Sequence, residues 1–193
     1  MCGRYYIPAE ATFSELDSLF DTIGGMHSGT AASPLIKRGE IFPTDTVPVI
    51  TGDAVKLMKW GFEGYGGNGL IINARVETAA EKPTFKEAFS AQRCLIPAGY
   101  YFEWKKSGTK KEKYAIKQSK PIYMAGLWRQ NENEALPLFV ILTRPALPEL
   151  GFIHDRMPVI LPKRAQELWL SGKLDSREIQ LLSNGVFYAD CVD

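Results

Sequence analysis

Hydrophobic positions follow a helical period in a few segments of the chain and a strand period in many more. Apolar side chains recur every three or four residues from Phe13 to Ile23, which predicts a helix that the Gly24-Gly25 pair ends. A polar, glycine-containing loop is expected to follow over 24–34. Three shorter helices are predicted: over 83–91, from Pro162 to Ser171-Gly172, and from a capping Ser176 to Asn184-Gly185.

Strand-like segments outnumber these helices and do not alternate with them regularly. Short apolar runs predict strands at 47–50, 55–60, 70–78, 94–104, 113–117, 122–128, 138–142 and 157–161. Near the end of 70–78, Asn73 and Arg75 share one face and Ala74 and Val76 the other. Because the order lacks regular βαβ units, we predict an α+β fold with a mixed, barrel-like β-sheet core flanked by a few helices. One domain is expected over residues 1–193.

Composition then restricts the class of protein. The 193 residues suffice for one domain with a substantial core, and no apolar run approaches the ~18 residues of a membrane span. No secretory signal is visible, and three scattered cysteines with two histidines argue against a structural zinc site. We expect a reduced, cytoplasmic protein without metal or cofactor. A net charge of +1 means that any phosphate binding must come from local groups of arginine and lysine.

The second residue carries the most reactive candidate chemistry. Once Met1 is removed, Cys2 presents an amine and a thiol two carbons apart. Their ordinary pKa values, near ~7.7–8 and ~8.5, leave both nucleophiles partly available at neutral pH. Such a pair can close a thiazolidine on an aldehyde or form an acyl-enzyme on an acyl carbon. The plain alternative is a cysteine that merely follows the start codon.

Several polar residues are candidates for the same site. Glu103 stands among four aromatic residues that would desolvate its carboxylate, raise its pKa and suit it to proton transfer. His154 and Arg156 flank an aspartate, which places a proton shuttle beside an anion-binding group. Ordinary solvent exposure is the alternative for these residues and for Asn73 and Arg75. The lysine-rich segment 105–111 fits a solvated hairpin better than a phosphate contact.

Short motifs occur along the chain in a specific order. They are Met1-Cys2-Gly3-Arg4, Pro43-Thr44 with Val47-Pro48-Val49, Trp60-Gly61-Phe62, Asn73-Ala74-Arg75-Val76-Glu77-Thr78, Arg93-Cys94-Leu95-Ile96-Pro97-Ala98, Phe102-Glu103-Trp104 and Ile153-His154-Asp155-Arg156-Met157-Pro158-Val159. Together they resemble the SOS-response-associated peptidase (SRAP) family, the abasic-site-processing proteins, over nearly the whole chain. The resemblance favours a functional interpretation of Cys2, Asn73, Glu103 and His154 over simple exposure.

The resemblance implies a protein that binds single-stranded DNA and links covalently to abasic sites. The amine of Cys2 would attack the C1′ aldehyde and its thiol would close a thiazolidine, once aminopeptidase or autoproteolytic peptidase activity has removed Met1. Glu103 and His154 would transfer protons, and Asn73 would orient Cys2. The implied candidates for DNA contact are Arg4, Trp60, Tyr65, Arg75, Lys86 and Arg156. The partner is abasic DNA and no membrane, bound by a monomer that is cytoplasmic and nucleoid-associated on DNA.

The chain also departs from the family pattern, and two other functions stay open. The segment 62–69 is rich in glycine where the family has proline and tryptophan, which reduces the aromatic side chains that could stack on bases to Tyr65. Gly99 stands one position early, and Leu147 occupies the place of an expected asparagine. The alternatives are an N-terminal-nucleophile (Cys) amidohydrolase or glutaminase-like enzyme, with Asn73 in the oxyanion hole, and a non-catalytic nucleic-acid-binding module.

Overall fold

The computed structural model describes residues 2–8, 13–27, 36–64, 66, 69–131 and 134–192. Its strands are β1 (Arg4–Ile7), β2 (Gly39–Ile41), β3 (Thr46–Ile50), β4 (Val55–Trp60), β5 (Phe62–Glu63), β6 (Leu70–Ile71), β7 (Asn73–Arg75), β8 (Arg93–Ser107), β9 (Lys110–Arg129), β10 (Leu138–Pro145), β11 (Arg156–Pro158) and β12 (Tyr188–Cys191). Its helices are α1 (Ser14–His27), α2 (Val76–Ala79), α3 (Pro83–Ala91), α4 (Lys163–Leu170) and α5 (Ser176–Leu182), with a 3-10 turn η3 (Pro148–Leu150).

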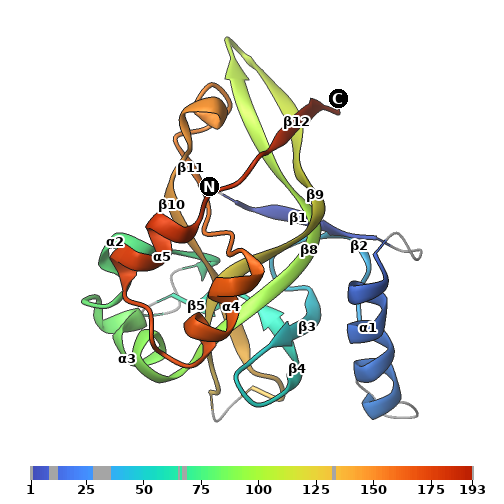
Figure 1. Ribbon diagram of the computed structural model, residues 1–193, viewed down its shortest axis with the longest axis vertical. Helices are drawn as coiled ribbons and strands as arrows, with labels where there is room; N and C mark the ends of the chain where they lie inside the picture. Colours follow the sequence, from blue (N-terminus) through green and yellow to red (C-terminus); the bar gives the residue numbers. More distant parts are fainter. Residues whose placement is uncertain are drawn as a thin grey trace.

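A mixed sheet organises the molecule. Within the described residues it has ten strands, with the order β12-β9-β10-β4-β3-β8-β1-β2 and with β7 and β11 paired to β10. A second pairing of β8 with β9 closes β9, β10, β4, β3 and β8 into a barrel. Figure 1 shows α2, α3, α4 and α5 gathered at one side of this barrel and α1 standing at the other.

The β8–β9 hairpin is the longest element and extends beyond the barrel (Figure 1). Its strands pair from Arg93↔Leu127 to Ser107↔Lys110, with a register shift between Ala98 and Tyr100. Gly108 closes the turn with φ of 61°, a left-handed conformation that glycine adopts without steric cost. Beyond the barrel, β8 also pairs with β1, so this end of the sheet carries the N-terminal segment.

Two apolar clusters fill the interior. The first contains Cys2, Tyr5 and Trp60 together with residues from the barrel strands, and the second lies between the sheet and the helices around Phe89 and Trp169. The Trp169 indole Nε1 donates a 3.0 Å hydrogen bond to the carbonyl oxygen of Cys94, which joins α4 to β8. Helix α4 therefore anchors the start of β8, the first strand of the hairpin. In the part of the chain that the structure describes, no helix is long and apolar enough to cross a membrane.

The predicted α+β class with a mixed, barrel-like sheet is confirmed, and so are most of the elements. The helix expected to end at Gly24-Gly25 instead continues to His27. A glycine costs a helix about 1 kcal/mol relative to alanine, and α1 tolerates the pair because Phe20 and Ile23 bury its apolar stripe. The loop expected over 24–34 is therefore helical at its beginning, and its remainder lies outside the described residues.

Other boundaries differ because tertiary packing overrides the local pattern. The strand predicted over 70–78 is divided into β6, which pairs with β5, and β7, which pairs with β10. It ends at Arg75, since Val76 and Ala79 turn into the second cluster as part of α2. The strands predicted at 113–117 and 122–128 are parts of the one strand β9. The strand predicted at 157–161 ends at Pro158.

The cap of the last helix was also misassigned. Asp175, and not Ser176, caps α5, because its Oδ1 accepts hydrogen bonds from the backbone N–H groups of Arg177 and Glu178. Four short strands, β1, β2, β5 and β12, were not predicted at all. β1 pairs with the projecting part of β8, β2 pairs with β1, and β12 pairs with β9, so the N-terminal segment is held in the sheet.

Candidate active site

Cys2 lies just before β1 and is fully buried in the first cluster. Its Sγ lies 3.8 Å from the carbonyl oxygen of Arg4. Its own carbonyl oxygen accepts a 2.8 Å hydrogen bond from Asn73 Nδ2. Burial, and after it the negative charge of Glu103, raises the pKa of the Cys2 thiol. The thiol is therefore protonated at neutral pH, and it must lose its proton as it attacks.

Glu103 is placed by the antiparallel pairing of β1 with β8. The pairs Arg4↔Phe102 and Tyr5↔Tyr101 set a register that, continued by one residue, brings Gly3 opposite Glu103. The Glu103 side chain is only 3% exposed. Burial raises the pKa of its carboxyl group, and a positive charge on His154 opposes this rise. A carboxyl group with a raised pKa can donate as well as accept protons closer to neutral pH.

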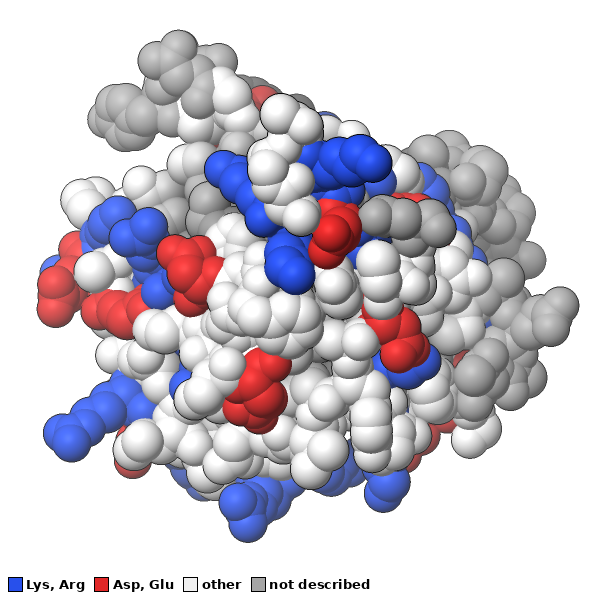
Figure 2. All heavy atoms as spheres, turned by 90° about the horizontal axis from the view of Figure 1, so that it is seen from above, with Lys and Arg blue, Asp and Glu red and all other residues white. Residues whose placement is uncertain are grey.

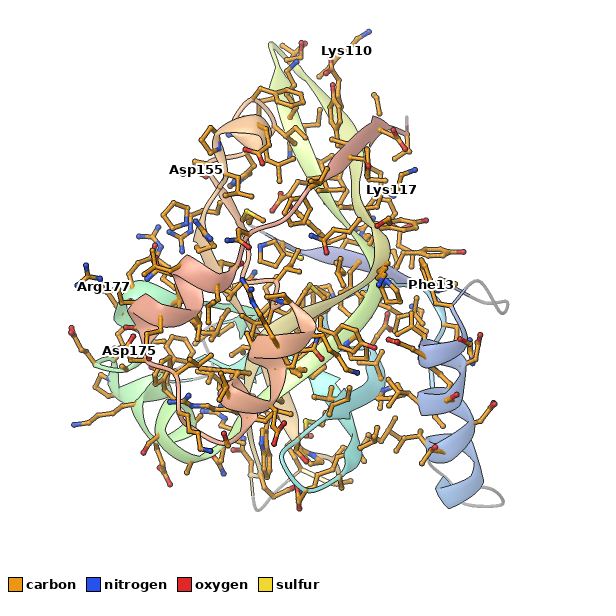
Figure 3. All side chains as sticks on the ribbon, viewed as in Figure 1. Phe13, Lys110, Lys117, Asp155, Asp175 and Arg177 are labelled. Carbon is orange, nitrogen blue, oxygen red and sulfur yellow. The ribbon has the colours of Figure 1, made fainter. Side chains whose placement is uncertain are left out.

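His154 lies in the loop between η3 and β11, on which Figure 3 labels Asp155. Its Nδ1 accepts a 3.0 Å hydrogen bond from the backbone N–H of Arg156, and Asp155 Oδ1 lies 2.7 Å from the same nitrogen. The first contact requires an unprotonated Nδ1 and the second favours a protonated one. The loop thus offers a partner to each protonation state, which suits a residue that exchanges protons.

Asn73 and Arg75 share one face of β7, which runs parallel to β10. Asn73 holds the Cys2 carbonyl through Nδ2, while its buried Oδ1 has no hydrogen-bond partner among the described residues. Arg75 is exposed and makes no ion pair within the described part of the chain. Arg156 instead donates to both carboxylate oxygens of Glu77 and to the carbonyl of Thr143. Of Arg75 and Arg156, Arg75 is therefore the one that has no ion-pair partner among the described residues.

Arg4 is engaged on the opposite face of β1 from the buried Tyr5. Its Nη1 donates to Glu40 Oε1 at 3.0 Å, and Lys113 Nζ donates to the same oxygen at 2.7 Å. Burial alone would raise the pKa of Glu40, but the hydrogen bonds from Lys113 and Arg4 lower it overall. Glu40 accepts from both cations, so Arg4 becomes available to a phosphate when that phosphate displaces Glu40.

Comparisons with known proteins place the chain in a family. The model of the SOS response associated peptidase (SRAP) family matches residues 1–188. The chain belongs to the SRAP family. It is 36% identical over 198 residues to the abasic site processing protein YedK of Escherichia coli (strain K12), covering 92% of this chain and 83% of that protein. It is 30% identical over 197 residues to the abasic site processing protein YoqW of Bacillus subtilis (strain 168), covering 90% and 81%.

Solved structures show the same fold. A protein from Bacteroides thetaiotaomicron superposes with a TM-score of 0.76 at 22% identity, covering 100% of this chain and 92% of that one. A phage-related protein from Bordetella bronchiseptica gives 0.72 at 25% identity, covering 99% and 94%. The fold of this chain therefore recurs in proteins of low sequence identity.

In this SRAP chain the four predicted catalytic residues gather at one place. Asn73 bonds to Cys2, the charge of Glu103 raises the pKa of the Cys2 thiol, and His154 acts on the pKa of Glu103. Sequence reasoning missed Tyr101, a buried neighbour whose hydroxyl pKa is raised by burial and then by Cys2 and Glu103. The alternation of positions 100–104 was the available signal, because it places Tyr101 and Glu103 on one face of the strand.

The residues predicted to contact DNA lie in different parts of the structure. Trp60 is corrected to a core residue, since it is fully buried and its Nε1 donates to the carbonyl of Ile72 at 3.0 Å. Lys86 is exposed, but on α3, which packs in the second cluster and not in the cluster of Cys2. Tyr65 lies outside the described residues.

The two point departures from the family pattern have local explanations. Gly99 sits at the register shift of β8, where an added Cβ would lie 3.1 Å from the ring of Pro8. Glycine therefore lets β1 approach β8 closely just before Glu103. Leu147 precedes η3 and packs against the first cluster, so an apolar residue fits this position.

Proposed function

We propose that this SRAP protein processes abasic sites in DNA by forming a covalent link through Cys2. The named abasic-site-processing relatives support the substrate class. The observation that carries the chemistry is the hydrogen bond from Asn73 to the Cys2 carbonyl beside a buried Glu103. It fixes the backbone of the nucleophilic residue next to a carboxyl group that is suited to proton transfer.

The proposed reaction begins at the ring-opened sugar. The α-amine of Cys2 adds to the C1′ aldehyde, and protonation of the resulting hydroxyl by Glu103 releases one water and leaves an imine. The Cys2 thiol then adds to the imine carbon, and its proton passes to the nitrogen through Glu103 or His154. The product is a thiazolidine, and the net change is the loss of one water.

The raised pKa of the thiol favours this order of steps. A protonated thiol is a weak nucleophile, so the amine reacts first and the thiol follows onto a carbon that the imine has made electrophilic. In the same proposal Arg75 binds a flanking phosphate. The substrate is a single strand, because a sugar held in a stacked duplex could not reach a buried residue without being flipped out. The protein acts in this proposal as a monomer.

Met1 must leave before the amine is available. We propose that Cys2 also serves here, since attack of its thiol on the Met1 carbonyl transfers the acyl group to sulfur, frees the Cys2 amine and leaves a thioester that water hydrolyses. Intact mass of the purified protein shows whether Met1 has been removed. We expect a mass without Met1 for the wild type.

The test of the crosslink uses a single-stranded oligonucleotide with one abasic site and a denaturing gel. We expect the wild type to give a covalent species without added reductant. Cys2→Ser and Cys2→Ala, prepared with Met1 removed by an added aminopeptidase, keep the amine but cannot close the thiazolidine, so their adduct should require borohydride trapping. No adduct for the processed wild type would overturn the proposal, and ammonia release from glutamine would favour the amidohydrolase instead.

A further inference from the structure

The face of the sheet opposite to the Glu103 side chain carries aromatic rings and cations. Residues that alternate with Tyr101 and Glu103 along β8, and the residues paired beside them, lie on this second face. One cross-strand row contains Tyr188, Lys117, Tyr100, Tyr6 and Glu40, and the next contains Asp190, Ala115, Phe102 and Arg4. We call these two rows, with Lys113 and Trp104 beyond them, the outer face.

Aromatic rings line the outer face, and all of them except Phe102 are at least partly exposed. Tyr188 is 53% exposed, and Tyr6 and Tyr100 are partly exposed. The rings of Tyr6 and Tyr100 stack at 4.8 Å and an interplanar angle of 6°, and Phe102 meets Tyr100 edge-on at 5.3 Å. Rings held in place by their neighbours can accept a further flat partner with little loss of side-chain entropy.

Cations accompany these rings. Lys113 Nζ lies 3.9 Å from the centre of the Phe102 ring. The hairpin segment 105–113 has five lysines and one glutamate, a net charge of +4, whereas the whole chain carries +1. Figure 3 labels Lys110 at the tip of this hairpin and Lys117 further along β9. Figure 2, a view onto the hairpin end, shows basic side chains in several groups with acidic side chains and uncharged surface between them.

The acidic side chains of the outer face are already bound to its cations. Glu40 accepts from Arg4 and Lys113, and Asp190 pairs with Lys117 at 2.5 Å. Each carboxylate occupies a place that the oxygens of another anion could take. An incoming phosphate would therefore compete with these two carboxylates for cations that are already oriented.

We propose that the outer face binds single-stranded nucleic acid, with bases stacked on Tyr188, Tyr100 and Tyr6 and phosphates at Lys113 and Lys117. Flat exposed rings interleaved with lysines suit bases and phosphates, because every base offers a π-face and every linkage a charge. The inference rests on the proposed function for the kind of partner. It adds a binding surface on the side of the sheet opposite to Glu103, so that a strand continues past the reactive nucleotide.

The test measures the affinity for a fluorescein-labelled thymidine oligonucleotide without an abasic site, by anisotropy at two salt concentrations. We expect Tyr188→Ala and the double variant Tyr6→Ala/Tyr100→Ala each to weaken binding about tenfold, and the corresponding phenylalanine variants to retain it. Lys113→Ala/Lys117→Ala should reduce the salt slope by about 1.4, near 0.7 for each lost phosphate contact. The control Leu181→Ala/Lys173→Ala, on exposed positions of α5 and the preceding turn, should bind like the wild type.

Glu40→Gln gives a result of opposite sign. It removes the competing carboxylate while keeping Arg4 and Lys113, so we expect tighter binding. Unchanged affinity in Tyr188→Ala and Glu40→Gln would overturn the proposal, and neither change removes a buried ring, so both variants should fold. Crosslinking of abasic DNA at saturating concentration is measured in parallel. Its absence in the wild type would overturn the covalent function, whereas the anisotropy measurement tests the outer face independently.

Discussion

The two faces of β8 place adjacent residues in opposite environments. Tyr101 and Glu103 point into the molecule, where burial raises the pKa of both side chains. Tyr100 and Trp104 point the other way and are partly exposed, with Lys113 paired opposite Trp104. One strand thus supplies a desolvated carboxyl group and a solvated aromatic surface at neighbouring positions.

The difference shows what each environment requires of its residues. On the inner face water is excluded, so a charged carboxylate is costly and the protonated form is favoured. On the outer face ions keep much of their hydration, and a pair such as Arg4–Glu40 can exchange one partner for another at small cost. Chemistry is therefore expected from the inner face and reversible binding from the outer one, and substitutions can test that division.

The largest effect is expected at Glu103. Glu103→Gln keeps the size of the side chain and removes its ability to transfer protons, so the rate of crosslink formation should fall about 100-fold or more. Affinity for the oligonucleotide without an abasic site should stay unchanged, because the residue is buried. Single-turnover gels give the rate and anisotropy gives the affinity. Equal losses in crosslinking rate and in oligonucleotide affinity would contradict the assignment of chemistry to one face and binding to the other.

Asn73 should follow with a smaller loss. Asn73→Ala removes the 2.8 Å hydrogen bond to the Cys2 carbonyl and leaves that oxygen without its side-chain donor. We expect about a tenfold slower crosslink from poorer positioning of Cys2, and a loss of about 1 kcal/mol in the free energy of unfolding. Crosslinking rates at saturating DNA, with urea denaturation alongside, measure both. A wild-type rate in a destabilised variant would make Asn73 a structural residue only.

The periodicity of hydrophobic positions was enough to predict the α+β class and the hairpin. It could also have divided the residues of 100–104 between two faces, which is how Tyr101 becomes a neighbour of Glu103. What it could not provide was long-range pairing. The contact from Asn73 to Cys2 spans 71 positions and joins β7, which pairs with β10, to the residue before β1, which pairs with β8. Trp60 failed as a DNA contact for the same reason, because only the closed barrel shows that its ring is inside.

A pH series tests how burial on the inner face couples the ionisation of Glu103 to stability. The folded-state pKa of Glu103 is raised above its ordinary value of 4.5, so ionisation disfavours the folded state. As pH rises from that ordinary value through the raised one, the wild type should lose free energy of unfolding relative to Glu103→Gln. Above the folded-state pKa the difference should become constant. Urea denaturation of both proteins from about pH 4 to about pH 8 measures it. A difference that does not change with pH would contradict the buried environment assigned to Glu103.

The smallest functional effect is expected where neither face is touched. Asp175 caps α5 through the N–H groups of Arg177 and Glu178, and Figure 3 labels Asp175 and Arg177 on that helix, away from the hairpin. Asp175→Ala should cost about 1 kcal/mol of stability, the usual loss for a helix cap. Crosslinking rate and oligonucleotide affinity should both match the wild type below the unfolding transition. A change in either would mean that general stability controls these measurements, and the effects assigned to the two faces would then need this variant as their reference.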